Sequence, residues 1–462
     1  MSELTDRLKQ FAPAIIDASL MFFFAMAVYY PGIFSFDSVS QYEEARSLFF
    51  TDLHAPGMAL LWSWLNHIPL GPVVVLVFNN LVFWTALCLF SLWLFPTSIL
   101  MQITFVFVVG MFPPIFTQLG LILEDIPCFS LLFFACTLLL FANVTAKRWV
   151  RWLLVLVVGG LLFYATLFRH NAILAIPPIC FWIVAVLTRG EKICFPKIIV
   201  FILGILLFTA VFLGNRLLVN NLVKGRTYYP VQMFQLYDII GISVAKQKVM
   251  LPEYLIKRNH PTIMDLEKIY MPTSDNFSGS YWDYDKKNIN ALNVFWLRTI
   301  WQNPLIYLKH RATIFAALFI GGSQYYYFSS SYIKGFEFHQ NILFKAYHKF
   351  ADLFVWKLNF LQQIYNQYHS KSKLVNHPVR LYVLFIGGIY WLVCLFVCIK
   401  AYLSRRKLSN FHAIFYIALS GFLYGAGYIF CAPTDEYRYW LWTVMAAIMC
   451  STIYVRDLIR PS

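Results

Sequence analysis

Charged side chains are scarce in this sequence. Asp, Glu, Lys and Arg together make up 13% of the 462 residues, whereas hydrophobic residues make up 60%. Soluble domains usually carry about 25% charged residues, so this chain has about half the charge of a typical soluble surface. Its mean hydropathy is +0.63. We therefore predict that the chain lies in a lipid bilayer, where a helical bundle can form one long unit regardless of chain length.

Acidic residues are fewer than basic ones. The chain has 22 Asp and Glu against 37 Lys and Arg, and its formal net charge is +15. In a soluble protein this balance would indicate binding to nucleic acid. In a membrane protein it is typical of Lys and Arg in cytoplasmic loops and of attraction to anionic lipid headgroups. The balance favours membrane lipids as partners and no nucleic acid.

The sequence has no cysteine spacing typical of a metal site or a disulfide framework, no low-complexity stretch and no internal repeat. The nine cysteines lie mostly in apolar runs, and none falls in the stretch 217–379. Their spacing fits neither a zinc site nor a disulfide framework, so we interpret them as small packing residues. We find no repeat of the kind on which many transporters are built.

Long apolar runs predict about ten membrane-spanning helices, since a span needs about twenty mainly apolar residues. The first run follows Arg7 and Lys9 and lacks a cleavage site, which is typical of an uncleaved signal anchor. The predicted spans are 13–31, 70–95, 98–115, 126–145, 150–168, 171–188, 196–214, 380–400, 411–431 and 440–456.

Basic clusters fall at alternate ends of these spans. Lys and Arg concentrate near 147–151, 189–197, 400–407 and 456–460, which places these ends and both termini in the cytoplasm. The sequence then divides into an N-terminal bundle at 1–215, a large exported region at 216–378 and C-terminal spans at 379–462. The apolar stretch 312–328 would reverse the last three spans if it crossed the membrane, so we expect a buried or re-entrant segment there.

The first exported loop gathers acids, a histidine and hydroxyls. It contains Asp37 in Ser-Phe-Asp-Ser, followed by Asp52 and His54 in Asp-Leu-His-Ala-Pro. A purely structural interpretation is helix capping, with Ser35 or Asp37 at one helix start and Asp52 at the next. The functional interpretation is a carboxylate that acts as a general base.

A second acidic motif, Glu124-Asp125-Ile-Pro, opens the span 126–145. Carboxylates at a helix N-terminus suit the helix dipole, so capping again explains them. Two adjacent acids beside hydrocarbon are nevertheless costly unless they are paired, hydrated or bound to metal. The pair is therefore a candidate site as much as a cap.

Two further motifs place arginines on the same predicted face. Arg169, His170 and Asn171 form a turn between two spans, where the positive-inside rule disfavours arginine. Asp435 and Arg438 lie in Asp-Glu-Tyr-Arg-Tyr at the entry of the last span. A guanidinium group here needs a carboxylate or phosphate partner, although Arg438 between aromatic residues could also be an interface anchor.

Together these motifs resemble the GT-C glycosyltransferases, polytopic enzymes that take sugars from polyprenyl-phosphate donors. The resemblance covers the architecture of most of the chain but only short motifs, namely those around Asp37 and Asp52–Pro56, Glu124–Pro127, Arg169–Asn171 and Asp435–Tyr439. It implies an all-α, GT-C-like bundle of about ten transmembrane helices with a mostly helical exported domain.

The resemblance also implies roles. Asp37 would match the acid that acts as base on the acceptor, and Glu124 or Asp125 the acid that shapes the site or holds a divalent metal, Mg or Mn. Arg169 and Arg438 would bind the donor phosphate. Further substrate contacts are expected from the remaining polar residues of the four motifs, Asp52, His54, His170, Asn171 and Asp435.

The function implied is transfer of a sugar to a glycan, lipopolysaccharide or protein outside the cytoplasm, in a bacterial inner membrane. The first loop lacks the Asp-x-Asp signature of the metal-dependent oligosaccharyltransferases, so metal use stays open. Three alternatives remain: a polymerase or ligase of O-antigen type, a transporter or flippase for a lipid-linked sugar, and a non-catalytic scaffold. The flippase would need polar groups near mid-membrane, whereas here they gather at one surface.

Overall fold

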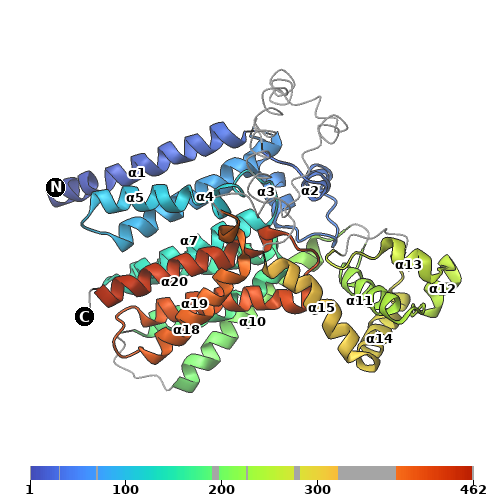
Figure 1. Cartoon of the computed structure of the whole chain (residues 1–462). Helices are drawn as coiled ribbons and strands as arrows, with labels where there is room; N and C mark the ends of the chain where they lie inside the picture. The colour runs from blue at the N-terminus through green and yellow to red at the C-terminus, as the bar shows by residue number, and fades with distance from the viewer. Residues whose placement is uncertain are drawn as a thin grey trace.

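A computed structural model describes residues 2–30, 32–68, 71–189, 197–224, 227–274, 281–320 and 381–459. Helices make up 79% of these residues, and no strand occurs among them. Its helices form a bundle with a smaller helical lobe at one end (Figure 1). The predicted all-α fold is confirmed.

Within the described ranges, seven helices are long and apolar enough to cross a membrane. Lipid supplies no partners for the backbone, so a crossing segment must satisfy its own hydrogen bonds, as a helix does. These helices support an integral, polytopic membrane protein. They are α1 (Ser2–Tyr29, apolar from Phe11), α4 (Val74–Leu94), α7 (Asp125–Val144), α8 (Arg148–Phe168), α10 (Lys197–Leu222), α19 (Phe411–Cys431) and α20 (Leu441–Ile459, with η7, Tyr437–Trp440, before it).

Three shorter apolar helices occupy the remaining predicted spans. They are α5 (Ile99–Gly110), α9 (Ile176–Thr188) and α18 (Gly387–Leu403). The 12 residues of α5 extend about 18 Å, against about 30 Å of hydrocarbon in a bilayer. The count of ten spans therefore stays a prediction. Helix α10 runs to Leu222, past the domain boundary placed at 215.

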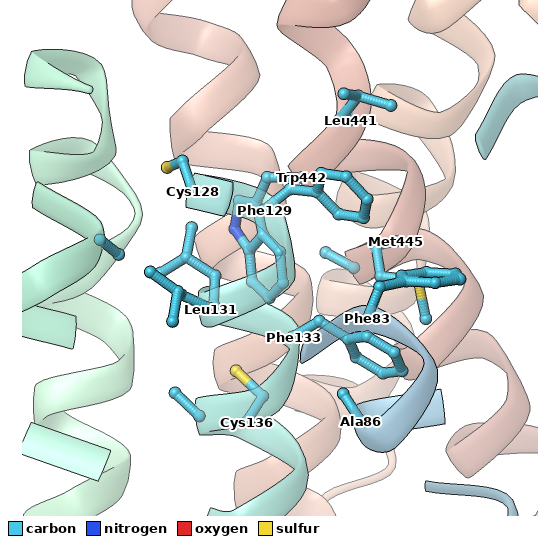
Figure 2. Close-up of a cluster of buried hydrophobic side chains, with 14 of the residues drawn as sticks. Phe83, Ala86, Cys128, Phe129, Leu131, Phe133, Cys136, Leu441, Trp442 and Met445 are labelled. Carbon is cyan, nitrogen blue, oxygen red and sulfur yellow. The ribbon is translucent and has the colours of Figure 1, made fainter. Parts of the chain in front are cut away.

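Helix α7 is the centre of the bundle. Of its span window 83% is buried, against 17% for α1 and α10, and it packs against α4, α8 and α20. Figure 2 shows the core where α4, α7 and α20 meet. The ring of Phe83 contacts the rings of Phe129 and Phe133, and Trp442 and Met445 belong to the same buried cluster. Because α7 is packed on several sides, the residues at its first turn are held in place.

The two ends of the bundle differ in charge. The loops and helix ends near the two chain termini carry a set of basic residues that defines the basic end: Lys147, Arg148, Arg151, Arg189, Arg405 and Arg456. The opposite end carries α2 (Phe36–Ser47), α3 (Gly57–Leu65), η1 (Gly71–Val73), α6 (Pro113–Phe116), η2 (His170–Leu174) and η6 (Leu381–Phe385). We call it the site end.

A helical lobe extends from the site end (Figure 1). It comprises α11 (Val231–Lys246), α12 (Glu253–Asn259), α13 (Ile263–Ile269), α14 (Lys286–Gln302) and α15 (Pro304–Phe319). A core of its own includes Leu236, Leu255 and Leu292. Helix α15 covers the start of the segment predicted to be buried, and Ile314 and Leu318 are buried. Residues 321–328 of that segment lie outside the described residues, as does the rest of 321–380.

A buried polar junction ties the lobe to the bundle. Asp238 of α11 is fully buried and receives Nε of Arg311 at 2.7 Å and Nε1 of Trp296 at 2.8 Å. Nε2 of His310 lies 3.3 Å from the same carboxylate. Arg311 also donates to the carbonyl of Ala432, just after α19. Charges this deep are tolerated only when paired, so the junction fixes the lobe against the segment that leads to Arg438.

Trp440 is enclosed by helix backbone. Its indole Nε1 donates to the carbonyl of Leu318 at 2.9 Å. A Cβ added at Gly387 would lie 2.1 Å from the indole, and one added at Gly425 would lie 2.7 Å from it. The two glycines thus allow α18 and α19 to close directly on the ring.

Candidate functional site

Helix α2 places Asp37 at the site end. Of the two residues predicted to cap this helix, Ser35 and Asp37, it is Ser35 that does so, in a capping box with Ser38. Ile33 pairs with the loop before α7, with its N–H donating to Gly120 at 2.8 Å and its carbonyl accepting from Ile122 at 2.9 Å. The Ser38 hydroxyl also donates to the Ile122 carbonyl. These contacts hold the first turn of α2 beside the start of α7.

The carboxylates at the start of α7 pair with Arg169 rather than cap the helix. Glu124 occupies the N-cap position without a capping hydrogen bond. Arg169 places Nε 3.0 Å from Asp125 Oδ1 and Nη1 3.3 Å from Glu124 Oε1. Gln41, one turn after Asp37, donates to the other oxygen of Glu124. Asp125 and Glu124 thus orient one guanidinium group.

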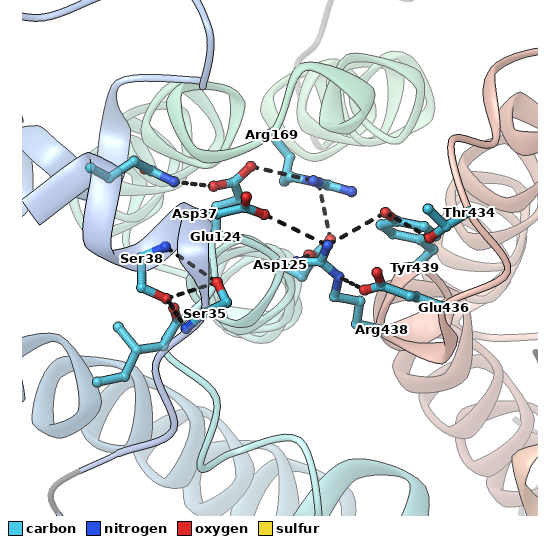
Figure 3. A network of polar contacts seen from close by, with 12 residues as sticks. Ser35, Asp37, Ser38, Glu124, Asp125, Arg169, Thr434, Glu436, Arg438 and Tyr439 are labelled. Carbon is cyan, nitrogen blue, oxygen red and sulfur yellow. Dashed lines mark hydrogen bonds and ion pairs between the residues drawn. The ribbon is translucent and has the colours of Figure 1, made fainter. Parts of the chain in front are cut away.

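Arg438 of η7 completes the cluster. Its Nη1 lies 3.4 Å from Asp125 Oδ2, its Nη2 lies 3.9 Å from Asp37 Oδ2, and its Nε pairs with Glu436. Asp125 therefore bridges two guanidinium groups, one through each oxygen. Figure 3 shows these residues converging from four segments of the chain. We call this set the Asp–Arg cluster: Asp37, Glu124, Asp125, Arg169, Glu436 and Arg438.

Tyr439 supports both arginines. The guanidinium carbons of Arg169 and Arg438 lie 5.0 and 5.2 Å from the centre of its ring, within the range of cation–π attraction. Tyr428 stacks on Tyr439 at 5.2 Å, its hydroxyl donates to that of Tyr424 at 3.3 Å, and the Asn171 side chain interacts with the same hydroxyl. The aromatic pair therefore limits the positions that the guanidinium groups can take.

The six members of the cluster differ in accessibility. The side chain of Asp125 is 1% exposed and that of Glu124 is 7%, whereas Asp37 is 34% exposed. Burial opposes the charge of Arg169, but the carboxylates of Asp125 and Glu124 raise the pKa of its guanidinium well above the usual value. The buried carboxylates thus stabilise the charged guanidinium groups, whereas Asp37 is an accessible carboxylate beside Arg438.

The other predicted site residues lie around the cluster or apart from it. Asp52 does not cap α3 but accepts the backbone N–H groups of Tyr228 and Tyr229 and so anchors the first loop to the lobe. His54 lies near buried Glu44. His170 is exposed beside Arg169, and Asp435 is buried next to Glu436. The structure thus brings together Asp37, Glu124, Asp125, Arg169 and Arg438.

Gln41, Glu436 and Tyr439 belong to the site but were not predicted for it. One signal was present in the sequence, because Gln41 follows Asp37 by four residues and so shares its helix face. Glu436 is the N-cap residue of the short 3-10 helix that contains Arg438 and Tyr439, and sequence spacing does not say which side chains of such a helix face inward.

A divalent metal does not fit the cluster as it stands. In the described part of the chain, no group of three or more His, Cys, Asp or Glu side chains is arranged to hold a metal ion. The carboxylates of the Asp–Arg cluster are directed at guanidinium groups instead. The chemistry that this arrangement supports is proton transfer at Asp37 next to anion binding by two arginines.

No family model matches this chain, and neither a curated protein nor a solved structure shows significant similarity to it. The fold and the site define an all-α polytopic membrane protein with a buried ion-pair cluster at one end of its bundle.

Proposed function

We propose that this protein is a membrane glycosyltransferase that moves a sugar from a polyprenyl-phosphate donor to an extracytoplasmic acceptor. The observation that supports it is the Asp–Arg cluster at the end of a lipid-embedded bundle. In this cluster the accessible carboxylate of Asp37 lies beside Arg438, and Asp125 bridges Arg438 to a second oriented guanidinium group. A donor with a lipid tail would reach this depth from the bilayer, and its phosphate requires cationic partners.

The reaction is an inverting displacement. Asp37 takes the proton from an acceptor hydroxyl, and the hydroxyl oxygen bonds to the anomeric carbon of the donor sugar. The bond from that carbon to the phosphate oxygen breaks, and polyprenyl phosphate leaves with the electron pair. Arg169 and Arg438 stabilise the charge that develops on the phosphate. Asp125 and Glu124 act as positioning residues for these arginines.

The arginines keep donors for a phosphate even while paired. A guanidinium group has five N–H donors, and Arg169 uses only Nε and Nη1 in its ion pairs with Asp125 and Glu124. The contact of Arg438 with Asp37 is long, at 3.9 Å. Four carboxylates face two guanidinium groups in the cluster, so a phosphate must compete for the arginines, and loosening the Arg438–Asp37 contact would also free the base.

Sidedness follows from charge. The basic end carries Lys147, Arg151 and Arg405, which the positive-inside rule assigns to the cytoplasm. The site end would then face the periplasm or exterior of a bacterial inner membrane. Cysteines introduced at exposed Lys257 in the lobe and at exposed Arg405 test this. A membrane-impermeant maleimide should label only the lobe position in intact cells, and the reverse pattern would overturn the orientation.

The function is tested by replacing Asp37 with Asn. Purified protein is incubated with polyprenyl-phosphate hexoses and pentoses and with delipidated envelope glycans as acceptors, and transfer is measured. Loss of a general base typically costs about 10²–10⁴-fold in rate, so we expect kcat to fall by at least about a hundredfold. The matched control is Glu43→Gln, an exposed acid on the same helix, which should act like the wild type. Near-normal transfer by Asp37→Asn would remove Asp37 as the base, and no transfer by wild type from any donor would overturn the function.

A further inference from the structure

A cavity of about 820 Å³ lies in the half of the bundle nearest the basic end, away from the Asp–Arg cluster. Its walls come mainly from α1 and α4, with the last turn of α7 and Arg456 of α20 at its far end. Cavities of about 300–1,000 Å³ are the size that holds a small-molecule ligand. The site proposed above makes no use of this space.

The shape of the cavity follows the helix axes. Its lining runs along α1 from Phe11 to Phe23 and along α4 from Leu81 to Trp93. Each stretch rises about 18 Å at 1.5 Å per residue. One leaflet contributes about 15 Å of hydrocarbon, half of the bilayer core. The cavity therefore matches in length a hydrocarbon chain that lies parallel to the helices within one leaflet.

The chemistry of the lining changes along this length. The walls are apolar or aromatic apart from small hydroxyl groups such as Ser19 and Thr85, and Arg456 is the one charged side chain among the described residues that line it. Its guanidinium carbon lies 4.4 Å above the ring of Trp93 and Nη1 donates to the Trp93 carbonyl at 3.0 Å. The cavity is therefore an apolar groove with an oriented cation at its membrane-surface end, and we call it the groove.

We propose that this groove binds an anionic phospholipid of the leaflet at the basic end, with an acyl chain between α1 and α4 and the phosphate at Arg456. Basic pockets between transmembrane helices recognise anionic headgroups in this way. The acyl chain is held by van der Waals packing against the groove walls, because the surrounding lipid is as apolar as the side chains that line the groove. The groove is distinct from the proposed donor site because its charged end lies at the opposite face of the bundle from Arg438.

Native mass spectrometry of the full-length protein in detergent tests the proposal, with dioleoyl phosphatidylglycerol, dioleoyl phosphatidylcholine and a polyprenyl phosphate as probes. We expect phosphatidylglycerol to bind with about one molecule per chain and more tightly than phosphatidylcholine. Arg456→Gln should weaken the phosphatidylglycerol complex about fivefold, the effect of about 1 kcal/mol for one basic residue. Thr85→Trp and Ser19→Trp, at exposed positions in the lining, should reduce binding of any lipid.

Two matched controls accompany these variants. Arg405 lies at the same end, donates to the carbonyl of Tyr402 and packs over its ring at 4.8 Å, yet it does not line the groove. Gly160 faces open space, where a Cβ would meet nothing within 4 Å. Arg405→Gln and Gly160→Trp should bind phosphatidylglycerol like the wild type.

Three results would overturn the proposal. Equal affinity for phosphatidylglycerol and phosphatidylcholine would remove the headgroup contact, and unchanged binding in the groove tryptophan variants would place the lipid elsewhere. A polyprenyl phosphate that binds more tightly than phosphatidylglycerol, and is lost in the same tryptophan variants, would make the donor lipid the occupant. None of these readouts depends on glycosyl transfer, so they stand whether or not the proposed function holds.

Discussion

Removing the carboxylate of Asp125 should strongly destabilise the protein. Asp125 bridges Arg169 at 3.0 Å and Arg438 at 3.4 Å, and the side chains of both arginines are less than 15% exposed. Breaking a buried ion pair from one side costs about 3–5 kcal/mol because a buried charge loses its partner. Each arginine keeps another carboxylate, Glu124 or Glu436. We therefore expect Asp125→Asn to cost about 3 kcal/mol, the lower end of that range.

The assay is a double-mutant cycle. The free energy of unfolding is measured for the wild type, Asp125→Asn, Arg169→Gln and the double variant, by titrating a denaturing detergent into protein held in mild micelles. Because Asn no longer carries the charge that Arg169 needs, the second substitution should cost less in the variant than in the wild type. Contacting residues typically couple by about 0.5–3 kcal/mol, and we expect about 2 kcal/mol here.

Asp457→Asn serves as the control for this cycle. Asp457 is a buried carboxylate near the opposite end of α20, where it accepts hydrogen bonds from the backbone and side chain of Asn410. Combined with Arg169→Gln, it should be additive to within about 0.5 kcal/mol. A cost below about 1 kcal/mol for Asp125→Asn, or equal coupling in both cycles, would refute the view that Asp125 holds the arginines.

Three further outcomes are expected. Asp52→Asn should weaken the anchor at Tyr228 by about 1–2 kcal/mol and speed proteolysis of the loop before α11. Asp238→Asn should cost about 3–5 kcal/mol in the same unfolding titration, because Arg311 stays buried without its carboxylate. Burial raises the pKa of Glu44 more than its neighbours lower it. The folded state therefore loses stability as the pH rises from the usual Glu pKa of about 4.3 through the raised pKa of Glu44. Glu44→Gln should therefore be more stable relative to the wild type at pH 7 than at pH 4.

Each of these outcomes has its own control. Glu43→Gln, exposed on the same helix as Glu44, should show the wild-type pH dependence, and an identical profile for Glu44→Gln would contradict the effect of burial. Proteolysis at the wild-type rate in Asp52→Asn would show that the anchor is dispensable. If Asp238→Asn is no less stable than Glu253→Gln, a variant of an exposed acid on α12, the junction does not hold the lobe.

The membrane helices were largely predictable because lipid leaves the chain few choices. A long apolar run in hydrocarbon must form a helix to satisfy its backbone, and the predicted span 411–431 coincides with α19. The ends of the helices were less predictable than their positions. Helix α10, for example, continues past the polar residue Arg216 to Leu222. Helices α5 and α9 are apolar enough to lie in a membrane but too short for a full crossing.

The gathering of acids and arginines at one face was also predictable, but their pairing was not. On the predicted orientation, Arg169 lies on the face where the positive-inside rule disfavours arginine, which predicts an anionic partner without naming it. Which oxygen of Asp125 meets which arginine depends on the backbone of the turn after α8 and of η7, which sequence spacing does not determine. The contact of Asp52 was not predictable either. An acid shortly before a helix was expected to cap that helix, but Asp52 instead accepts a backbone hydrogen bond 176 residues away.

The close packing of Trp440 between α18 and α19 limits the substitutions that this protein can tolerate during evolution. Trp440 lies two residues after Arg438, and the glycines at 387 and 425 leave no room for even a methyl group beside it. A substitution there would be read, from the sequence alone, as a mild change in a hydrophobic helix. Because it displaces the indole, it would shift the backbone that carries Arg438 and should resemble the loss of a charged site residue. Natural variation in related chains is therefore expected to be as restricted at these two glycines as at the arginine itself.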